Sequence, residues 1–173
     1  LFRSSAASDV YKRQVVPPST SAKEIEALKP DGIFLSNGPG DPKVLTSAVN
    51  EVKEMMKLEI PIFGICLGHQ IMSLAYDLKI EKMPFGHHGA NHPVHDLKNN
   101  TVFITSQNHN FAVAEVEDRA DISITHKSLF DGSIQGIEHC EKPFYSIQCH
   151  PEASPGPKEF EVLFERFFED MNA

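Results

Sequence analysis

Apolar residues in the first half of the chain alternate between short continuous runs and stretches with helical spacing. The runs at 32–36 (GIFLS) and 60–66 (IPIFGIC) are apolar and partly β-branched, which favours buried strands. Two amphipathic stretches, 44–56 and 67–78, repeat apolar residues at the spacing of a helix face. Strands that alternate with helices predict a parallel sheet covered by helices on both faces.

From residue 79 onward the pattern changes to short strands separated by turns. The expected strands cover 79–83, 93–97, 101–105, 111–115, 121–125, 133–138 and 144–149. The chain closes with a helix at about 157–171, whose apolar face is formed by Phe160, Leu163, Phe164, Phe167 and Phe168. The predicted fold class is therefore α/β, with an open, mostly parallel sheet and helices on both faces.

Three further stretches of the sequence have recognisable local patterns. A capping-box pattern at 21–24 predicts a short helix that ends before Pro30, and the triplet at 98–100 predicts a hairpin turn. Residues 1–14 are small, polar and aperiodic, and they lack the apolar run of a first core strand. We interpret 1–14 as a foreign-looking leader or a disordered tail, and 15–173 as one domain.

The second apolar run ends in a pattern that can carry a nucleophile. Gly64, Cys66 and Gly68 form Gly-x-Cys-x-Gly between a strand and a helix, which is the layout of a nucleophile elbow with cysteine in place of serine. A helix that starts beneath the sulfur favours the thiolate over the thiol. The alternative is that Cys66 is a small buried hydrophobe and the glycines are ordinary turn residues.

A thiolate nucleophile needs a base, and the base needs an orienting group. His150 and Glu152 follow the last expected strand, and residues two apart in extended chain face the same side. Pro151 favours the extended conformation at His150, and Cys149 then faces the opposite side. A surface His-x-Glu pair is the alternative, which the elbow makes the weaker of the two.

Two backbone N–H groups are candidates for stabilising an oxyanion. One belongs to Leu67, directly after the expected nucleophile, and the other lies near Gly40 in the broken loop at 37–42 (NGPGDP). The loop and Cys66 both follow strands, so a parallel sheet brings them to one rim. The loop could also be a plain strand-ending turn, and it lacks the Gly-Lys-Ser/Thr of a phosphate loop.

Composition narrows the class of protein without naming a reaction. The chain has 173 residues, 40% of them hydrophobic, and a formal net charge of −8, which argues against nucleic-acid and anionic-membrane surfaces. Three cysteines without paired spacing favour a reducing cytoplasm over a disulfide framework. A metal site is disfavoured because His87, His88, His92 and His95 match no familiar zinc spacing. His69 is expected to pack or orient the elbow.

The motifs together resemble a known family. GICLGHQ at 64–70 with HPE at 150–152 is similar to the class I, triad-type glutamine amidotransferases. Further stretches resemble, within that family, the glutaminase domain of carbamoyl-phosphate synthetase small subunits: PDGIFLSNGPGDP, FGHHGANHPV, TSQNHNFAV, HKSLFDGSIQGIEH and HPEASPGP. The resemblance runs from about residue 15 to the C-terminus.

The resemblance implies that Cys66 attacks the side-chain amide of L-glutamine and that His150, held by Glu152, transfers the protons. It implies glutamine contacts at Gly38, Gly40, Leu67, Gln70, Asn108, Asn110 and Phe111. It also implies no cofactor in this chain, with ATP and Mg used by a large synthetase subunit that receives the ammonia. Asn110 stands where many relatives have glycine, and we expect asparagine to keep a positive φ there.

The resemblance also implies that this sequence lacks parts of the family's small subunit. The N-terminal domain of that subunit and the first strand and helix of its glutaminase domain have no counterpart here, so we expect a truncated and poorly stable domain. Two alternatives remain open from the residues: a catalytically silent module that docks on a synthetase, and a free-standing cysteine hydrolase.

Overall fold

The computed structural model describes residues 12–114, 116, 119–152 and 162–173. The helices are α1 (Ala22–Ala27), α2 (Thr46–Met55), α3 (Leu67–Ala75) and α4 (Val162–Asp170), with short 3₁₀ turns η2 (Pro42–Val44) and η3 (Met56–Leu58). The strands are β1 (Ile33–Leu35), β2 (Ile62–Ile65), β3 (Ile80–Asp96), β4 (Thr101–Val113), β5 (Ile122–Ser128), β6 (Ile134–His139) and β7 (Phe144–Ile147).

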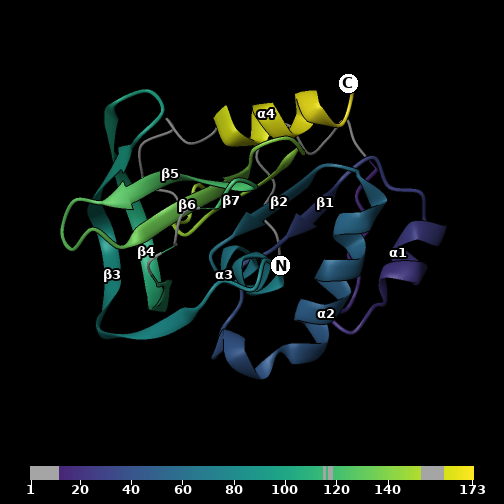
Figure 1. The fold of residues 1–173 in the computed structure, drawn as a ribbon, viewed down its shortest axis with the longest axis horizontal. Helices are drawn as coiled ribbons and strands as arrows, with labels where there is room; N and C mark the ends of the chain where they lie inside the picture. Colours follow the sequence, from purple (N-terminus) through teal and green to yellow (C-terminus); the bar gives the residue numbers. More distant parts are fainter. Residues whose placement is uncertain (1–11, 115, 117–118, 153–161) are drawn as a thin grey trace.

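The strands form one sheet in the order β1-β2-β7-β6-β4-β3-β5 (Figure 1). Among the strands of the described residues, only β1–β2 and β2–β7 pair in parallel. All other pairings are antiparallel, and β5 also pairs with β6, so β6, β4, β3 and β5 close into a ring. The prediction of an open, mostly parallel sheet is therefore wrong beyond β2 and β7, because consecutive strands joined by turns pair antiparallel and closure leaves no free edge there.

The sequence pattern predicts four short strands where the structure has the two long strands of the hairpin β3–β4. The expected strands 79–83 and 93–97 belong to β3, and 101–105 and most of 111–115 belong to β4. Prolines and glycines within 84–93 resemble strand breakers, yet β3 continues through them with register shifts between Lys82 and His87 and between Gly89 and His92. Such irregularities accommodate residues that a regular ladder excludes. The turn predicted at 98–100 is confirmed between the two strands.

Helices cover both faces of the parallel part of the sheet, as predicted. Alternate residues of β2 divide between the faces: Ile62 packs with α1, α2 and α3, whereas Phe63 packs with Phe167 of α4. Figure 1 accordingly shows α4 on one side of the sheet and α1 to α3 on the other. The predicted capping box is confirmed, since Ser21 and Glu24 bond each other's backbone N–H groups at the start of α1.

Part of the final-helix prediction can be compared with the structure. Helix α4 begins at Val162 among the described residues and buries Phe167, while Phe160 lies outside them. Within the described part of the chain, no helix is long and apolar enough to cross a membrane.

Candidate active site

Cys66 stands at the sharp turn between β2 and α3. Its backbone has φ 51° and ψ −102°, a conformation that non-glycine residues adopt rarely and that is typical of strained functional positions. It occupies the N-cap of α3, and its N–H donates to the carbonyl of Ile147 over 2.9 Å. The sulfur therefore lies at the positive end of a helix, as the elbow predicts.

The two glycines of the elbow are required by close packing. A Cβ on Gly68 would lie 2.1 Å from the carbonyl oxygen of Leu35, and a Cβ on Gly64 would lie 2.9 Å from the backbone of Gly68. Neither distance is compatible with a side chain, so both glycines let α3 approach β1 and β2. This packing favours the nucleophile elbow over an ordinary turn.

His150 lies against both Cys66 and Glu152. Its Nδ1 is 2.8 Å from Oε1 of Glu152, and its backbone N–H donates to the carbonyl of Ser106 over 2.9 Å. The interaction with Cys66, followed by that with Glu152, raises the pKa of His150 to about 10. Nε2 is buried and has no partner of full hydrogen-bond geometry among the described residues, although the interaction with Cys66 is the largest cause of the raised pKa.

The raised pKa of His150 makes a prediction about stability and pH. The folded protein favours the protonated ring, so the pairing with Glu152 stabilises the fold below the ordinary pKa of 6.5 and stops doing so as the pH rises through about 10. Replacing Glu152 by glutamine should therefore lower the free energy of unfolding by up to about 1 kcal/mol near pH 6.5, since the carboxylate is partly exposed. This difference should shrink towards pH 10, as measured by urea unfolding.

Glu169→Gln on α4 provides the control, because this exposed carboxylate lies on another element. Its effect on the free energy of unfolding should vary little between pH 6.5 and 10. A Glu152→Gln effect that stayed constant or grew over this range would contradict the pairing.

The second cysteine of the region, Cys149, belongs to the core cluster that also contains Cys66. It is 1% exposed and packs in the core between the sheet and α4, and burial raises the pKa of its thiol. The thiol of Cys149 is thus buried in the core, while its placement on the side opposite His150 and Glu152 stays a prediction.

The glycine loop after β1 lies beside the start of α3. A Cβ on Gly38 would meet Cδ2 of Leu67 at 2.8 Å, so the loop and the helix N-terminus are in contact. Gly40 has φ +109° with open space around it, so its backbone conformation alone demands glycine. The prediction that the loop and Cys66 share one rim of the sheet is confirmed.

Gln70 lies one turn along α3 from Cys66 and is 3% exposed. Its Nε2 donates to the carbonyl of Phe111 over 2.9 Å and to Oε1 of Gln148 over 3.0 Å. Because both N–H bonds are used inside the protein, Gln70 can offer a ligand only its amide oxygen.

Asn108 and Asn110 lie on the outer face of β4, where both are exposed. The ring of His88 bridges them: Nδ1 is 3.0 Å from Oδ1 of Asn108, and Nε2 is 3.2 Å from Oδ1 of Asn110. The expected positive φ at Asn110 is wrong, because Asn110 belongs to a strand and is absent from the residues with positive φ. Sequence reasoning missed the bridging role of His88, which depends on the β3–β4 register that pairs it with Asn108.

His69 is fully buried beneath the elbow, as expected of a packing residue. Its Nδ1 is 2.8 Å from Oγ of Ser146 in β7, and burial lowers the pKa of the ring to about 3. A neutral, buried imidazole that joins α3 to β7 holds the elbow on the sheet.

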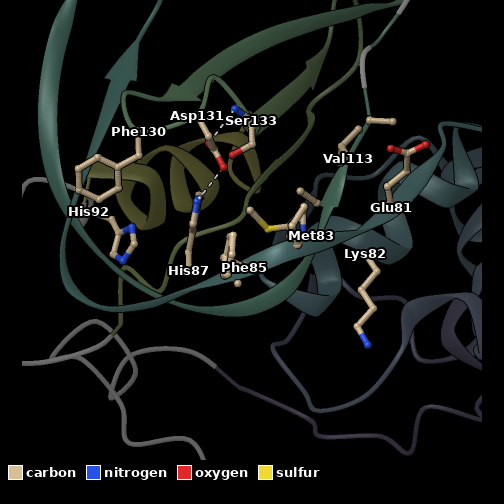
Figure 2. A pocket seen from close by; sticks show the side chains of 14 residues that line it. Glu81, Lys82, Met83, Phe85, His87, His92, Val113, Phe130, Asp131 and Ser133 are labelled. Atoms are coloured by element: carbon tan, nitrogen blue, oxygen red, sulfur yellow. Dashed lines mark hydrogen bonds and ion pairs between the residues drawn. The ribbon is translucent and has the colours of Figure 1, made fainter.

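A pocket of about 570 Å³ lies within the closed part of the sheet (Figure 2). Its lining comes from β3, the end of β4 and the turn between β5 and β6, and it includes none of the predicted site residues. Figure 2 shows His87 directed at Asp131, with Nε2 3.0 Å from the carboxylate, and His92 beside Phe130. Across the described ranges, no group of three or more His, Cys, Asp and Glu residues is arranged to hold a metal ion.

Comparisons with known proteins agree with this geometry. The family described as "Glutamine amidotransferase class-I" matches residues 1–170. A carbamoyl phosphate synthase small chain from Buchnera aphidicola subsp. Baizongia pistaciae is 57% identical over 157 residues, which cover 91% of this chain and 40% of the relative. The small chain from Escherichia coli K12 is 54% identical over 155 residues, covering 90% and 41%. This chain thus spans about 40% of the length of these curated relatives.

A solved structure supports the fold independently. A putative GMP synthase protein from Thermoplasma acidophilum superimposes with a TM-score of 0.78 at 22% identity, covering 92% of this chain and 80% of that one. At this identity the likeness concerns the fold alone. The match of the family over nearly all of the sequence is decisive, and the chain belongs to the class I glutamine amidotransferases.

Proposed function

We propose that this chain is the glutaminase part of a glutamine-hydrolysing carbamoyl-phosphate synthetase. It would convert L-glutamine to glutamate and ammonia and deliver the ammonia to a large synthetase subunit. The observation that carries the proposal is the meeting of Cys66, His150 and Glu152 at the elbow, with His150 Nδ1 2.8 Å from Glu152. The small-chain relatives, more than half identical in sequence, support the choice of synthetase.

In the first step, the sulfur of Cys66 attacks the side-chain carbonyl carbon of glutamine. The N–H of Leu67 and an N–H near Gly40 would stabilise the oxyanion, a role supported by the contact between the loop at Gly38 and Leu67. His150 donates its proton to the leaving nitrogen, the carbon–nitrogen bond breaks, and ammonia leaves a γ-glutamyl thioester on Cys66.

In the second step, neutral His150 takes a proton from water, which attacks the thioester carbonyl. The carbon–sulfur bond breaks, glutamate leaves, and the proton returns to the Cys66–His150 pair. Glu152 keeps the imidazole oriented throughout through its bond to Nδ1.

The substrate contacts belong to the same proposal. Gly38, Gly40, Leu67, Gln70, Asn108, Asn110 and Phe111 would hold the glutamine. The free amide oxygen of Gln70 suits an ammonium group, because its nitrogen is already bonded to Phe111 and Gln148. The exposed amides of Asn108 and Asn110 would contribute polar groups from β4, held in place by His88.

The proposed reaction requires no cofactor in this chain, because a thiolate, an imidazole and a carboxylate supply all of its proton transfers. ATP and Mg would act in the large subunit, where ammonia and bicarbonate yield carbamoyl phosphate. Handing ammonia directly to the partner avoids its protonation in water, which would remove its nucleophilicity. Free thiols at all three cysteines suit the reducing cytoplasm in which we place the complex.

The test is glutamate release from L-glutamine, measured with and without a synthetase large subunit. We expect release that increases when the large subunit is present. A catalytically silent docking module would release no glutamate under either condition, and a free-standing cysteine hydrolase would act regardless of the partner. Either of these two results would overturn the proposal.

A further inference from the structure

We propose that Gln107 and Gln135, two buried amides inside the closed part of the sheet, are positioning residues that align His150 with Cys66. The inference rests on the proposed function, because the two glutamines would keep His150 and Cys66 in the geometry that the proposed reaction needs. Neither side chain touches the reacting atoms, and they act through the strands that hold His150.

The segment that carries His150 is hydrogen-bonded through its backbone to two strands, β4 and β6. On one side, the N–H of His150 donates to the carbonyl of Ser106 in β4 over 2.9 Å. On the other side, the N–H of Gln148 donates to the carbonyl of Gln135 in β6 over 2.8 Å. The position of His150 is therefore set by the spacing between β4 and β6.

The backbone ladder does little to fix that spacing. Among the described residues, β4 and β6 share one paired position, Val113 with Ile134. At the level of His150 the two strands are joined by side chains instead: Nε2 of Gln107 donates to Oε1 of Gln135 over 2.9 Å. Gln107 follows Ser106 directly, so this bond links both anchor points of the catalytic segment.

The hydrogen-bond partners fix the orientation of both amides. The second N–H of Gln107 donates to Oγ1 of Thr105, which must accept because its own hydrogen is donated to the carbonyl of His92. Nε2 of Gln135 donates to Oγ of Ser133 over 3.1 Å. Gln107 is 2% exposed and Gln135 is 0% exposed, so neither amide can exchange these partners for bulk water.

The same network reaches the helix that carries Cys66. Oε1 of Gln107 lies 3.0 Å from Nε2 of His109, and Nδ1 of the same ring lies 2.8 Å from the carbonyl oxygen of Phe111. Burial lowers the pKa of His109 to about 4, so the neutral ring carries one N–H and donates to one of these two oxygens. The carbonyl of Phe111 accepts from Gln70 of α3, and Gln70 bonds Gln148 in turn. Because the N–H of Gln148 donates to the carbonyl of Gln135, the amide pair is linked through Gln148 both to His150 and to α3.

The experiment replaces each amide by methionine, which has a similar length and makes no strong hydrogen bond. We expect Gln107→Met and Gln135→Met each to lower kcat for glutamine hydrolysis by roughly 10- to 100-fold, as expected for misplacement of a catalytic group by about 1 Å. KM should change by less than about 3-fold, because substrate contacts remain. The double variant should be no worse than the poorer single variant, because the two amides act as one unit.

A second readout separates positioning from general stability. The NMR titration of the His150 ring should have its midpoint near the value of about 10 in the wild type and move towards the ordinary 6.5 in both variants, because Cys66 is no longer aligned. Ser128→Ala is the control: this buried hydroxyl accepts from the N–H of Phe130 and bonds neither glutamine amide, so its loss should leave kcat and the titration unchanged.

Gln135→Asn guards against variants that fail to fold, because it keeps an amide and shortens its reach by one methylene group. Wild-type kcat and a wild-type His150 midpoint in any folded variant of Gln107 or Gln135 would overturn the proposal. The titration is recorded without substrate. A wild type that releases no glutamate would refute the proposed function, while the titration would still decide whether the amides position His150.

Discussion

Replacing Cys66 by serine is expected to lower glutamate release from L-glutamine by at least about 10⁴-fold, because removal of an elbow nucleophile abolishes the covalent route. The change exchanges one sulfur for one oxygen at a position with 5% exposure, so the fold around it should persist. A serine hydroxyl is a much weaker acid than a thiol, so it stays protonated beside His150 and is the poorer nucleophile. The measurement is steady-state glutamate release in the presence of the large subunit.

Cys140→Ser is the matched control for this loss, since Cys140 carries the same group on an exposed part of the surface. It should leave the rate of glutamate release unchanged. If the wild type and Cys66→Ser release glutamate at the same rate, Cys66 is not the nucleophile, although the protein would still be a glutaminase.

The geometry of the candidate catalytic centre could be predicted from the sequence because its determinants are local. The elbow needs glycines beside Cys66 at a strand–helix junction, and those glycines are adjacent in the chain. His150 and Glu152 are two residues apart, so extended backbone suffices to place them on one side. Only the meeting of the two motifs required a fold, and the parallel pairing of β2 with β7 provides it.

The closed part of the sheet could not be predicted in the same way, because its structure depends on register between distant residues. The irregularities of β3 conceal a continuous strand, and the pairing of β5 with β6 that closes the ring leaves no mark in local pattern. The bridge from His88 to Asn108 and the bond from Gln107 to Gln135 likewise depend on the register between distant residues. Buried polar residues that hydrogen-bond each other across strands cannot be told from surface residues in the pattern of polar and apolar positions along the sequence.

The expected glutamine contacts came from family resemblance rather than from pattern, and they remain proposals. The structure nevertheless shows how some of these residues are held within the protein. Gln70 and the carbonyl of Phe111 are bonded to each other, so each holds the other in place. Asn110 lies in a strand, where an asparagine side chain adds a polar group that glycine lacks.

Replacing Gly68 by alanine is expected to lower the free energy of unfolding by about 3 kcal/mol, the upper end of the usual cost of overpacking a core contact. The added Cβ would lie 2.1 Å from the carbonyl oxygen and 2.7 Å from the carbonyl carbon of Leu35. Both are backbone atoms of β1, which pairs with β2 and cannot swing aside as a side chain would. Helix propensity alone predicts the opposite sign, since alanine stabilises a helix by about 1 kcal/mol relative to glycine.

Urea unfolding measures this loss, with Gly132→Ala as the control. Gly132 has φ +73°, and a methyl group added there would have no neighbouring atom within 4 Å, so alanine meets only backbone strain of about 1 to 2 kcal/mol. The excess loss at Gly68 then reports the close approach of α3 to β1. Because α3 presents Cys66 at its N-cap, pushing the helix outward should also lower glutamate release in any Gly68→Ala protein that folds. A Gly68→Ala protein as stable as the wild type would contradict the packing that holds the elbow in place.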